Sequence, residues 1–197
     1  MEKIKCRAAI LFDMGLSRPF ATSKPVRVEK IELDPPGFGE VLVKVSAAGL
    51  CHSDLSVVNG NRPRAMPMVL GHEGSGIIET LGNGVENFKV GDHVVFVFVP
   101  SCGNCIPCKE GRPALCEPGL AAGGAGTLLS GEKRIRLNGD LINHQVGVSC
   151  FAEYTVVSCK SLVKVEKNLP LDEAALFGCA VITGAGAVFN TANIRVG

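Results

Sequence analysis

The sequence predicts a mainly β protein with a few short helices, folded as a partly closed β-barrel that carries a four-cysteine zinc lobe. Short strand-like runs lie between frequent turn signals, since 24 glycines and 11 prolines are scattered along 197 residues. The runs VRVEKIEL and VLVKVSA alternate apolar and polar residues, which indicates half-buried antiparallel strands. Four of the nine cysteines stand in the stretch CGNCIPCKEGRPALC at 102–116.

The expected strands are short, and most are bounded by glycine, proline or polar residues. The run VVFVFV is apolar throughout, which favours an interior strand. The strands predicted are Lys5–Phe12, Arg27–Leu33, Val41–Ser46, Gly76–Leu81, His93–Val99, Ala152–Val157 and Leu162–Val165.

Helical signals are fewer. One short helix is expected near Cys51, with Ser53 and Asp54 as capping residues. A second starts near Leu171, where LDEAALF follows a proline and places acids in the first turn. The run CAVITGAGAVFNTA is a third candidate, and the glycine-rich stretch at 119–131 is expected to be a loop.

Composition excludes several classes of protein. Twenty basic and 19 acidic residues give a formal charge of +1, so neither nucleic acid nor a membrane surface is expected as the main partner. No apolar run approaches the ~20 residues that span a bilayer. The start MEKIKCRAAILF lacks a signal-peptide pattern, so a cytoplasmic location is expected. Nine cysteines, an odd and partly clustered number, favour metal binding over disulfides.

The clustered cysteines form C-x2-C-x2-C-x7-C, and four soft thiolates close a tetrahedral zinc site. An iron–sulfur cluster is the main alternative, although the spacing of bacterial ferredoxins, C-x2-C-x2-C-x3-C-P, differs in its last gap. Free or disulfide-bonded thiols are the third. Four protein ligands leave no open position for a substrate, so the zinc is expected to be structural. Its ligands would be Cys102, Cys105, Cys108 and Cys116.

Three further segments, GLCHSDL, LGHEGSG and FGCAVITGAG, carry a second set of metal-binding residues. Each is weak alone, because single cysteine and histidine residues usually serve packing or structural hydrogen bonds. Together Cys51, His72 and Cys179 supply two thiolates and one imidazole. That three-ligand set, with its fourth position open, is the one described for alcohol dehydrogenase.

The chain resembles the N-terminal catalytic domain, a GroES-like barrel, of zinc-dependent medium-chain alcohol dehydrogenases. The stretch GHEGSGIIETLGNGV at 71–85 fits the family signature GHE-x2-G-x5-G-x2-V, and AGLCHSD and GCAVITGAG match the flanks of the other two catalytic ligands. The four-cysteine stretch matches the family's structural-zinc lobe in spacing as well as residue type. The resemblance covers roughly residues 5–197.

The resemblance implies a role for each metal-site residue. Cys51, His72 and Cys179 would bind a catalytic zinc, in addition to the structural one. Glu73 would lie behind the metal as a second-shell group or transient ligand. Asp54 would hydrogen-bond the other imidazole nitrogen of His72, which fixes its tautomer.

Other roles concern the substrate and the cofactor. Ser53 would contact the alcohol hydroxyl and pass on its proton, His52 would meet the cofactor's pyrophosphate, and Thr183 would lie beside the nicotinamide. Phe98 would form an aromatic wall of the substrate channel, although a buried core position is the simpler interpretation. Ser56 stands where liver-type members carry the histidine that ends the proton relay, so the end of the relay is left open. No function is assigned to Asp92 and His93 (turn and strand start), His144 (solvated), or Cys6, Cys150 and Cys159 (packing).

The implied reaction is the reversible oxidation of primary or aromatic alcohols to aldehydes, with NAD(P) bound mainly by a Rossmann domain. Neither GLAAGGAG nor TGAGAV has the strand–turn–helix context of such a domain. The expected organisation is a GroES-like catalytic domain at 1–170, with its zinc lobe at 100–118. A helical segment at 171–197, ending in NIRVG, would lead toward a dinucleotide-binding domain absent from this chain.

Such a fragment is expected to be inactive alone, and the full-length protein to be a homodimer or homotetramer. The alternative is a zinc-stabilised GroES-like binding or structural module without catalysis. A ferredoxin-like electron carrier is a third possibility.

Overall fold

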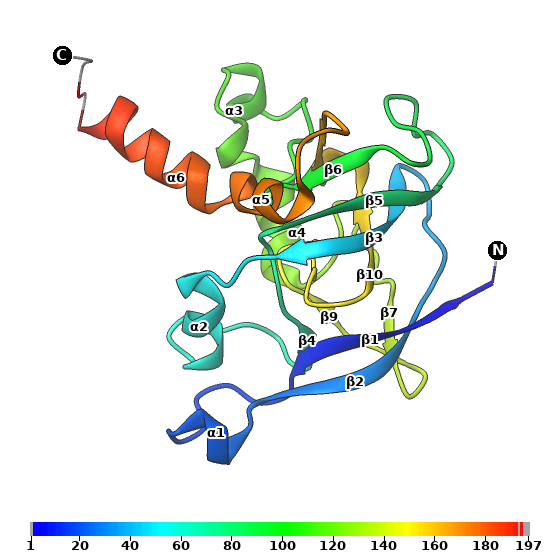
Figure 1. Cartoon of the computed structure of the whole chain (residues 1–197), viewed down its shortest axis with the longest axis vertical. Helices are drawn as coiled ribbons and strands as arrows, with labels where there is room; N and C mark the ends of the chain where they lie inside the picture. Colours follow the sequence, from blue (N-terminus) through cyan, green and yellow to red (C-terminus); the bar gives the residue numbers. More distant parts are fainter. Residues whose placement is uncertain (1, 193, 195–197) are drawn as a thin grey trace.

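The computed structural model describes residues 2–192 and 194, and its strands form two sheets (Figure 1). The six-stranded sheet has the order β8-β7-β2-β1-β4-β9, and the five-stranded sheet has the order β10-β3-β5-β6-β11. The strands are β1 (Ile4–Leu11), β2 (Val26–Leu33), β3 (Glu40–Ala48), β4 (Met68–Val69), β5 (Gly74–Leu81), β6 (His93–Phe96), β7 (Ile135–Leu137), β8 (Asp140–Leu141), β9 (Asn143–His144), β10 (Tyr154–Ser158) and β11 (Leu162–Val165).

The first sheet is built around the antiparallel pair β1–β2, which the alternating sequence predicted. Ile4 pairs with Leu33, and the register continues without a break to Leu11 opposite Val26. The apolar side chains of one face, among them Ile10 and Leu33, are almost fully buried in one core cluster. Because successive side chains of a strand point to opposite faces, the apolar residues of an alternating sequence lie on one face, and here that face packs against the core.

The second sheet holds the interior strands. β3 pairs along nearly its whole length with β5, and Gly76 of β5 allows this approach, because a Cβ there would lie 2.3 Å from the Lys44 carbonyl oxygen. The run VVFVFV was expected to continue as a strand to Val99, but β6 ends at Phe96. Beyond it the Val97 N–H bonds to Ser161 O, and the chain turns so that Phe98 is 37% exposed. The prediction for this strand was correct in type and too long.

Residues 151–153 connect the two sheets into a partly closed barrel. Ala9 N donates to Phe151 O, and Glu153 N donates to Arg7 O, so residues 151–153 bond to β1. Glu153 O also accepts from Val45 N of β3, in the other sheet. The predicted mainly β, partly closed barrel is confirmed.

The helices are short (Figure 1). The predicted loop at 119–131 was wrong, because α4 occupies its first half. Pro118 stands in the first turn, and Gly126 ends the helix in the left-handed conformation, as expected for a helix C-terminus. Gly119 is required by packing, since a Cβ there would lie 2.3 Å from the Pro100 carbonyl oxygen. The α-helices are α1 (Phe20–Ser23), α2 (His52–Val58), α3 (Ile106–Lys109), α4 (Glu117–Ala125), α5 (Leu171–Ala174) and α6 (Ala180–Gly186).

The C-terminal helices confirm the two helical predictions made there. α6 continues as a π turn to Thr191 and extends away from the sheets (Figure 1). Among the described residues no single helix is long and apolar enough to cross a membrane. One pair, Leu171–Gly178 with Ala180–Thr191, reaches that length and composition, but is bent by 51°. Positions 193 and 195–197, most of the expected NIRVG boundary, lie outside the described residues.

His144 was expected to be solvated, and this was wrong. Its side chain is fully buried, and its Nε2 accepts a hydrogen bond from Arg134 N. Burial, with smaller effects of Lys133 and Arg134, lowers the pKa of His144 to about 3. The imidazole therefore stays neutral in the fold. Cys6 and Cys150 are buried as predicted.

Candidate metal centres

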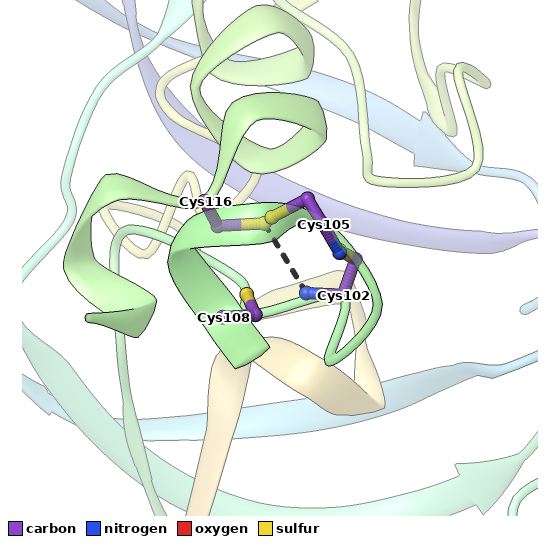
Figure 2. Close-up of side chains that lie close together, drawn as sticks. All are labelled: Cys102, Cys105, Cys108 and Cys116. Atoms are coloured by element: carbon purple, nitrogen blue, oxygen red, sulfur yellow. Dashed lines mark hydrogen bonds between the residues drawn. The ribbon is translucent and has the colours of Figure 1, made fainter. Parts of the chain in front are cut away.

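The four clustered cysteines converge as the sequence predicted (Figure 2). Their sulfur atoms all lie within 4.8 Å of one another, and Cys108 is held by α3. Backbone N–H groups of Asn104 and Cys105 point at Cys102 Sγ, at 3.4 and 3.3 Å. These hydrogen bonds lower the pKa of Cys102 to about 6, which favours the thiolate that a metal requires. Four converging thiols fit a closed zinc site.

The second cluster unites residues that lie far apart in the sequence. Cys51 precedes α2, His72 lies between β4 and β5, and Cys179 precedes α6. Cys51 Sγ lies 3.8 Å from Cys179 Sγ, and Cys179 Sγ lies 3.6 Å from His72 Nε2. Tetrahedral zinc, with bonds of about 2.3 Å to sulfur and about 2.0–2.1 Å to nitrogen, requires ligand separations of about 3.8 and about 3.6 Å. The donor geometry therefore fits zinc.

Glu73 joins this cluster as a fourth donor. One of its carboxylate oxygens belongs to the set of ligand atoms within 4.8 Å of one another, and the residue is 2% exposed. Gly49 makes room for it, because a Cβ at that position would lie only 3.0 Å from the carboxylate carbon. The three predicted ligands and the predicted neighbour are thus brought together in one site.

Asp54 organises the cluster through hydrogen bonds, two of which were not foreseen. His72 Nδ1 donates to Asp54 Oδ1 at 2.9 Å, as predicted. Gln145 Nε2 donates to the same oxygen at 2.8 Å, and Cys51 N donates to Oδ2 at 3.1 Å. Gln145 Oε1 also accepts from Gly71 N. Because a carboxylate only accepts, Nδ1 of His72 carries the proton, and the Nε2 lone pair faces the other ligands.

The same contacts shift the pKa of the His72 imidazole, and they also show that the N-cap of α2 differs from the predicted one. Burial lowers the pKa of His72, but the hydrogen bonds and charges of Asp54 and Cys51 together raise it more, so the net direction is upward. The cap of α2 was expected from Ser53 and Asp54. Instead Cys51 is the N-cap and accepts from Ser53 N, while Asp54 completes the capping box.

A cavity of about 400 Å³ opens onto the cluster. Phe98 packs edge-on against the His72 ring, with centroids 5.8 Å apart, so it lies at the cavity wall rather than in the core. Ser53 and Thr183 also reach the cavity. Its lining consists of Cys51, Ser53, Val57, Arg62, Arg64, His72, Phe98, Gln145, Val146, Cys179, Ala180 and Thr183.

His52 does not line this cavity. It is exposed, and Ser56 Oγ lies 3.4 Å from its Nδ1 and donates to its backbone oxygen at 3.0 Å. Sequence reasoning missed Arg62, Arg64 and Gln145. The basic segment NRPR at 61–64 between two ligand motifs was an available signal for the arginines. No local pattern marked Gln145.

Residues 37–167 match the alcohol dehydrogenase GroES-like domain. The chain belongs to this family. Alcohol dehydrogenase class-3 from Drosophila melanogaster is 42% identical over 98% of the chain, which covers 49% of that protein. An S-(hydroxymethyl)glutathione dehydrogenase from Synechocystis is 40% identical over 98% of the chain and 51% of its own length.

Solved structures agree with the family assignment. An alcohol dehydrogenase zinc-binding domain protein from Burkholderia ambifaria superposes with a TM-score of 0.88 at 34% identity, over all of this chain and 51% of that one. Benzyl alcohol dehydrogenase from Acinetobacter calcoaceticus gives 0.82 at 35% identity, over 95% and 48%. The GroES-like barrel is thereby confirmed, and the chain spans about half the length of the relatives it matches.

Proposed function

We propose that this chain is the catalytic-zinc domain of an NAD(P)-dependent alcohol dehydrogenase that reversibly oxidises primary or aromatic alcohols to aldehydes. The observation that carries the proposal is the spacing of Cys51, His72 and Cys179, which fits tetrahedral zinc, in the lining of one cavity. The names of the relatives, alcohol dehydrogenase class-3 and benzyl alcohol dehydrogenase, support this class of activity. A GroES-like module without catalysis would need the four-cysteine site but not this second one.

The two ligand sets would hold two zinc ions per chain, one structural and one catalytic. A zinc ion at the second site would supply a Lewis acid that lowers the pKa of an alcohol hydroxyl. The nicotinamide of NAD(P) would accept the hydride from the carbinol carbon, which leaves the aldehyde and one proton.

This chain's residues bind and orient the alcohol. Ser53 lines the cavity and can accept a hydrogen bond from the hydroxyl, so that its Oγ would take the departing proton while the serine's own hydroxyl proton passes on to water. Phe98 and Val57 offer apolar walls to an aromatic or aliphatic group, and Thr183 would support the nicotinamide. Asp54 and Gln145 hold the imidazole of His72 in one tautomer and one orientation.

Hydride transfer also needs a bound cofactor at contact distance. The glycine-rich candidates do not provide a cofactor-binding turn, since GLAAGGAG lies largely in α4 and TGAGAV in α6 and its π turn. We therefore propose that NAD(P) is held mainly by a further domain, and that the 197-residue chain alone has little activity. We further propose domain limits near 170, a cytoplasmic location, and a homodimeric or homotetrameric full-length protein.

Metal analysis of the purified chain tests the proposal. Wild-type protein should contain two zinc ions, and Cys51→Ala should contain one, because the four-cysteine site is independent of it. After cobalt substitution, benzyl alcohol should change the visible absorption of wild-type protein and leave that of Cys51→Ala unchanged. One zinc in both proteins, with no response to benzyl alcohol, would favour the non-catalytic module. Brown, iron-containing protein would favour the electron carrier.

A further inference from the structure

Two arginines line the same cavity as the metal-binding residues. Arg62 and Arg64 lie in the loop between α2 and β4, and both reach the cavity that contains Cys51, His72 and Cys179. The loop is attached to α2 through a hydrogen bond from Arg62 N to Ser56 O at 3.0 Å. Arg62 is exposed and Arg64 is half-buried, and the Arg64 guanidinium donates to the neighbouring Pro63 O at 3.4 Å.

Neither guanidinium has an acidic partner among the described residues. The twelve residues that line the cavity include no aspartate or glutamate, and neither arginine takes part in an ion pair. Elsewhere in the fold, arginines near a carboxylate are paired with it, namely Arg7 with Glu153, Arg134 with Glu40 and Arg136 with Asp34. Two guanidinium groups in the cavity lining therefore lack a carboxylate partner among the described residues.

Two buried carboxylates, Glu73 and Asp54, lie beside the metal ligands, but neither forms an ion pair with Arg62 or Arg64. Guanidinium groups bind carboxylate and phosphate through paired hydrogen bonds. An uncharged alcohol could use the apolar walls formed by Val57, Phe98 and Val146, but it would leave both arginines without a partner.

We infer that Arg62 and Arg64 select alcohols and aldehydes that carry a carboxylate group remote from the reacting carbon. The inference rests on the proposed function, because the metal site must hold the hydroxyl at the other end of the same molecule. The phosphate groups of a nucleotide cofactor have the same chemistry as ligands for arginine. The experiment therefore includes a separate probe for them.

The test compares two probes that differ by one carboxylate, benzyl alcohol and 4-(hydroxymethyl)benzoate. Their affinities for the zinc-loaded 197-residue chain are measured by ligand-observed NMR at low salt. The variants are the double substitution Arg62→Gln with Arg64→Gln, and the control Arg112→Gln, an exposed arginine outside the cavity lining. ADP-ribose is the third probe, and zinc content is measured for every protein.

In wild type and in Arg112→Gln, the carboxylate probe should bind about tenfold more tightly than benzyl alcohol, as a charge-assisted hydrogen bond provides. The double variant should lose that preference and keep its affinity for benzyl alcohol. Equal binding of both alcohols to wild type, or a preference that survives in the double variant, would overturn the inference. So would a loss confined to ADP-ribose, which would assign the arginines to the cofactor. A zinc-loaded chain that binds neither alcohol would instead refute the proposed function, and the inference with it.

Discussion

Replacing Asp54 by asparagine should weaken zinc binding at the second cluster and leave the four-cysteine lobe loaded. The carboxylate accepts three hydrogen bonds, from His72 Nδ1 (2.9 Å), Gln145 Nε2 (2.8 Å) and Cys51 N (3.1 Å). An asparagine amide has one acceptor oxygen and one donor nitrogen. In either orientation at least one of these donors would face another donor.

The least damaging orientation turns the amide nitrogen toward Cys51 N and keeps the two contacts of Oδ1. It sacrifices one charge-assisted hydrogen bond and makes the other two neutral. Since a hydrogen bond to a charged group is worth about 1.5–3 kcal/mol, the expected loss is about 10–100-fold in zinc affinity. Loss of the Asp54 charge also removes one of the interactions that raise the pKa of His72.

The measurement is a zinc competition titration against a chromophoric chelator, in which the four-cysteine zinc serves as an internal standard. Asp92→Asn is the matched control. Its carboxylate is also buried, but it is paired with Lys164 Nζ at 2.9 Å, outside the metal cluster. The control should lower the free energy of unfolding without changing zinc affinity. If Asp54→Asn retains its second zinc as tightly as wild type does, the assigned role of Asp54 is wrong.

Three further predictions concern stability. Cys102→Ala should release the lobe zinc and lower the melting temperature strongly, whereas Cys51→Ala removes the side-chain cap of α2 and should lower the melting temperature less; equal losses in calorimetry would contradict this division. His144→Gln should flatten the acid side of the stability curve. The pKa of His144 is about 3 in the fold and about 6.5 in the unfolded chain, so between these pH values only the unfolded chain gains a proton. In urea titrations the free energy of unfolding of wild type should therefore fall by about 2 kcal/mol more than that of the variant between pH 7 and 5. Gly178→Ala should cost about 1–3 kcal/mol, because its Cβ would lie 2.0 Å from a carbonyl of β6, while Gly184→Ala in α6 meets no atom within 4 Å and should be neutral or slightly stabilising.

The sequence predicted best the features that depend on local pattern. The alternation in β2 predicts a half-buried strand, and the spacing of the four cysteines predicts a metal site. In both cases all the residues concerned lie within a short stretch of sequence. The glycines at 119–126 misled the prediction, because glycine usually weakens helices. In α4 the close approach of Gly119 to Pro100 overrides that propensity, and this contact is invisible without the fold.

In the second metal cluster, too, the residues marked by local motifs were predicted, whereas those brought in by long-range contacts were not. Cys51, His72 and Cys179 were found through their flanking motifs, but their spacing alone indicated nothing. Gln145 lies 91 residues from Asp54 in the chain, and its role follows only from a side-chain hydrogen bond. His144, in the polar run NHQ, was wrongly predicted to be solvated. Its burial is made possible by a hydrogen bond from the backbone N–H of Arg134, which the local sequence does not reveal.

The two metal centres differ in how soon a growing polypeptide can complete them. All four thiols of the lobe leave the ribosome within one short stretch, since Cys102 and Cys116 are separated by 14 positions. The other centre needs Cys179, whose thiol lies 128 positions after Cys51. At synthesis rates of about 5–20 residues per second, several seconds separate the two events. A nascent chain could therefore bind a metal in its four-cysteine lobe while the second cluster still lacks one of its ligands, so premature release would yield a lobe that can be loaded beside an incomplete second centre.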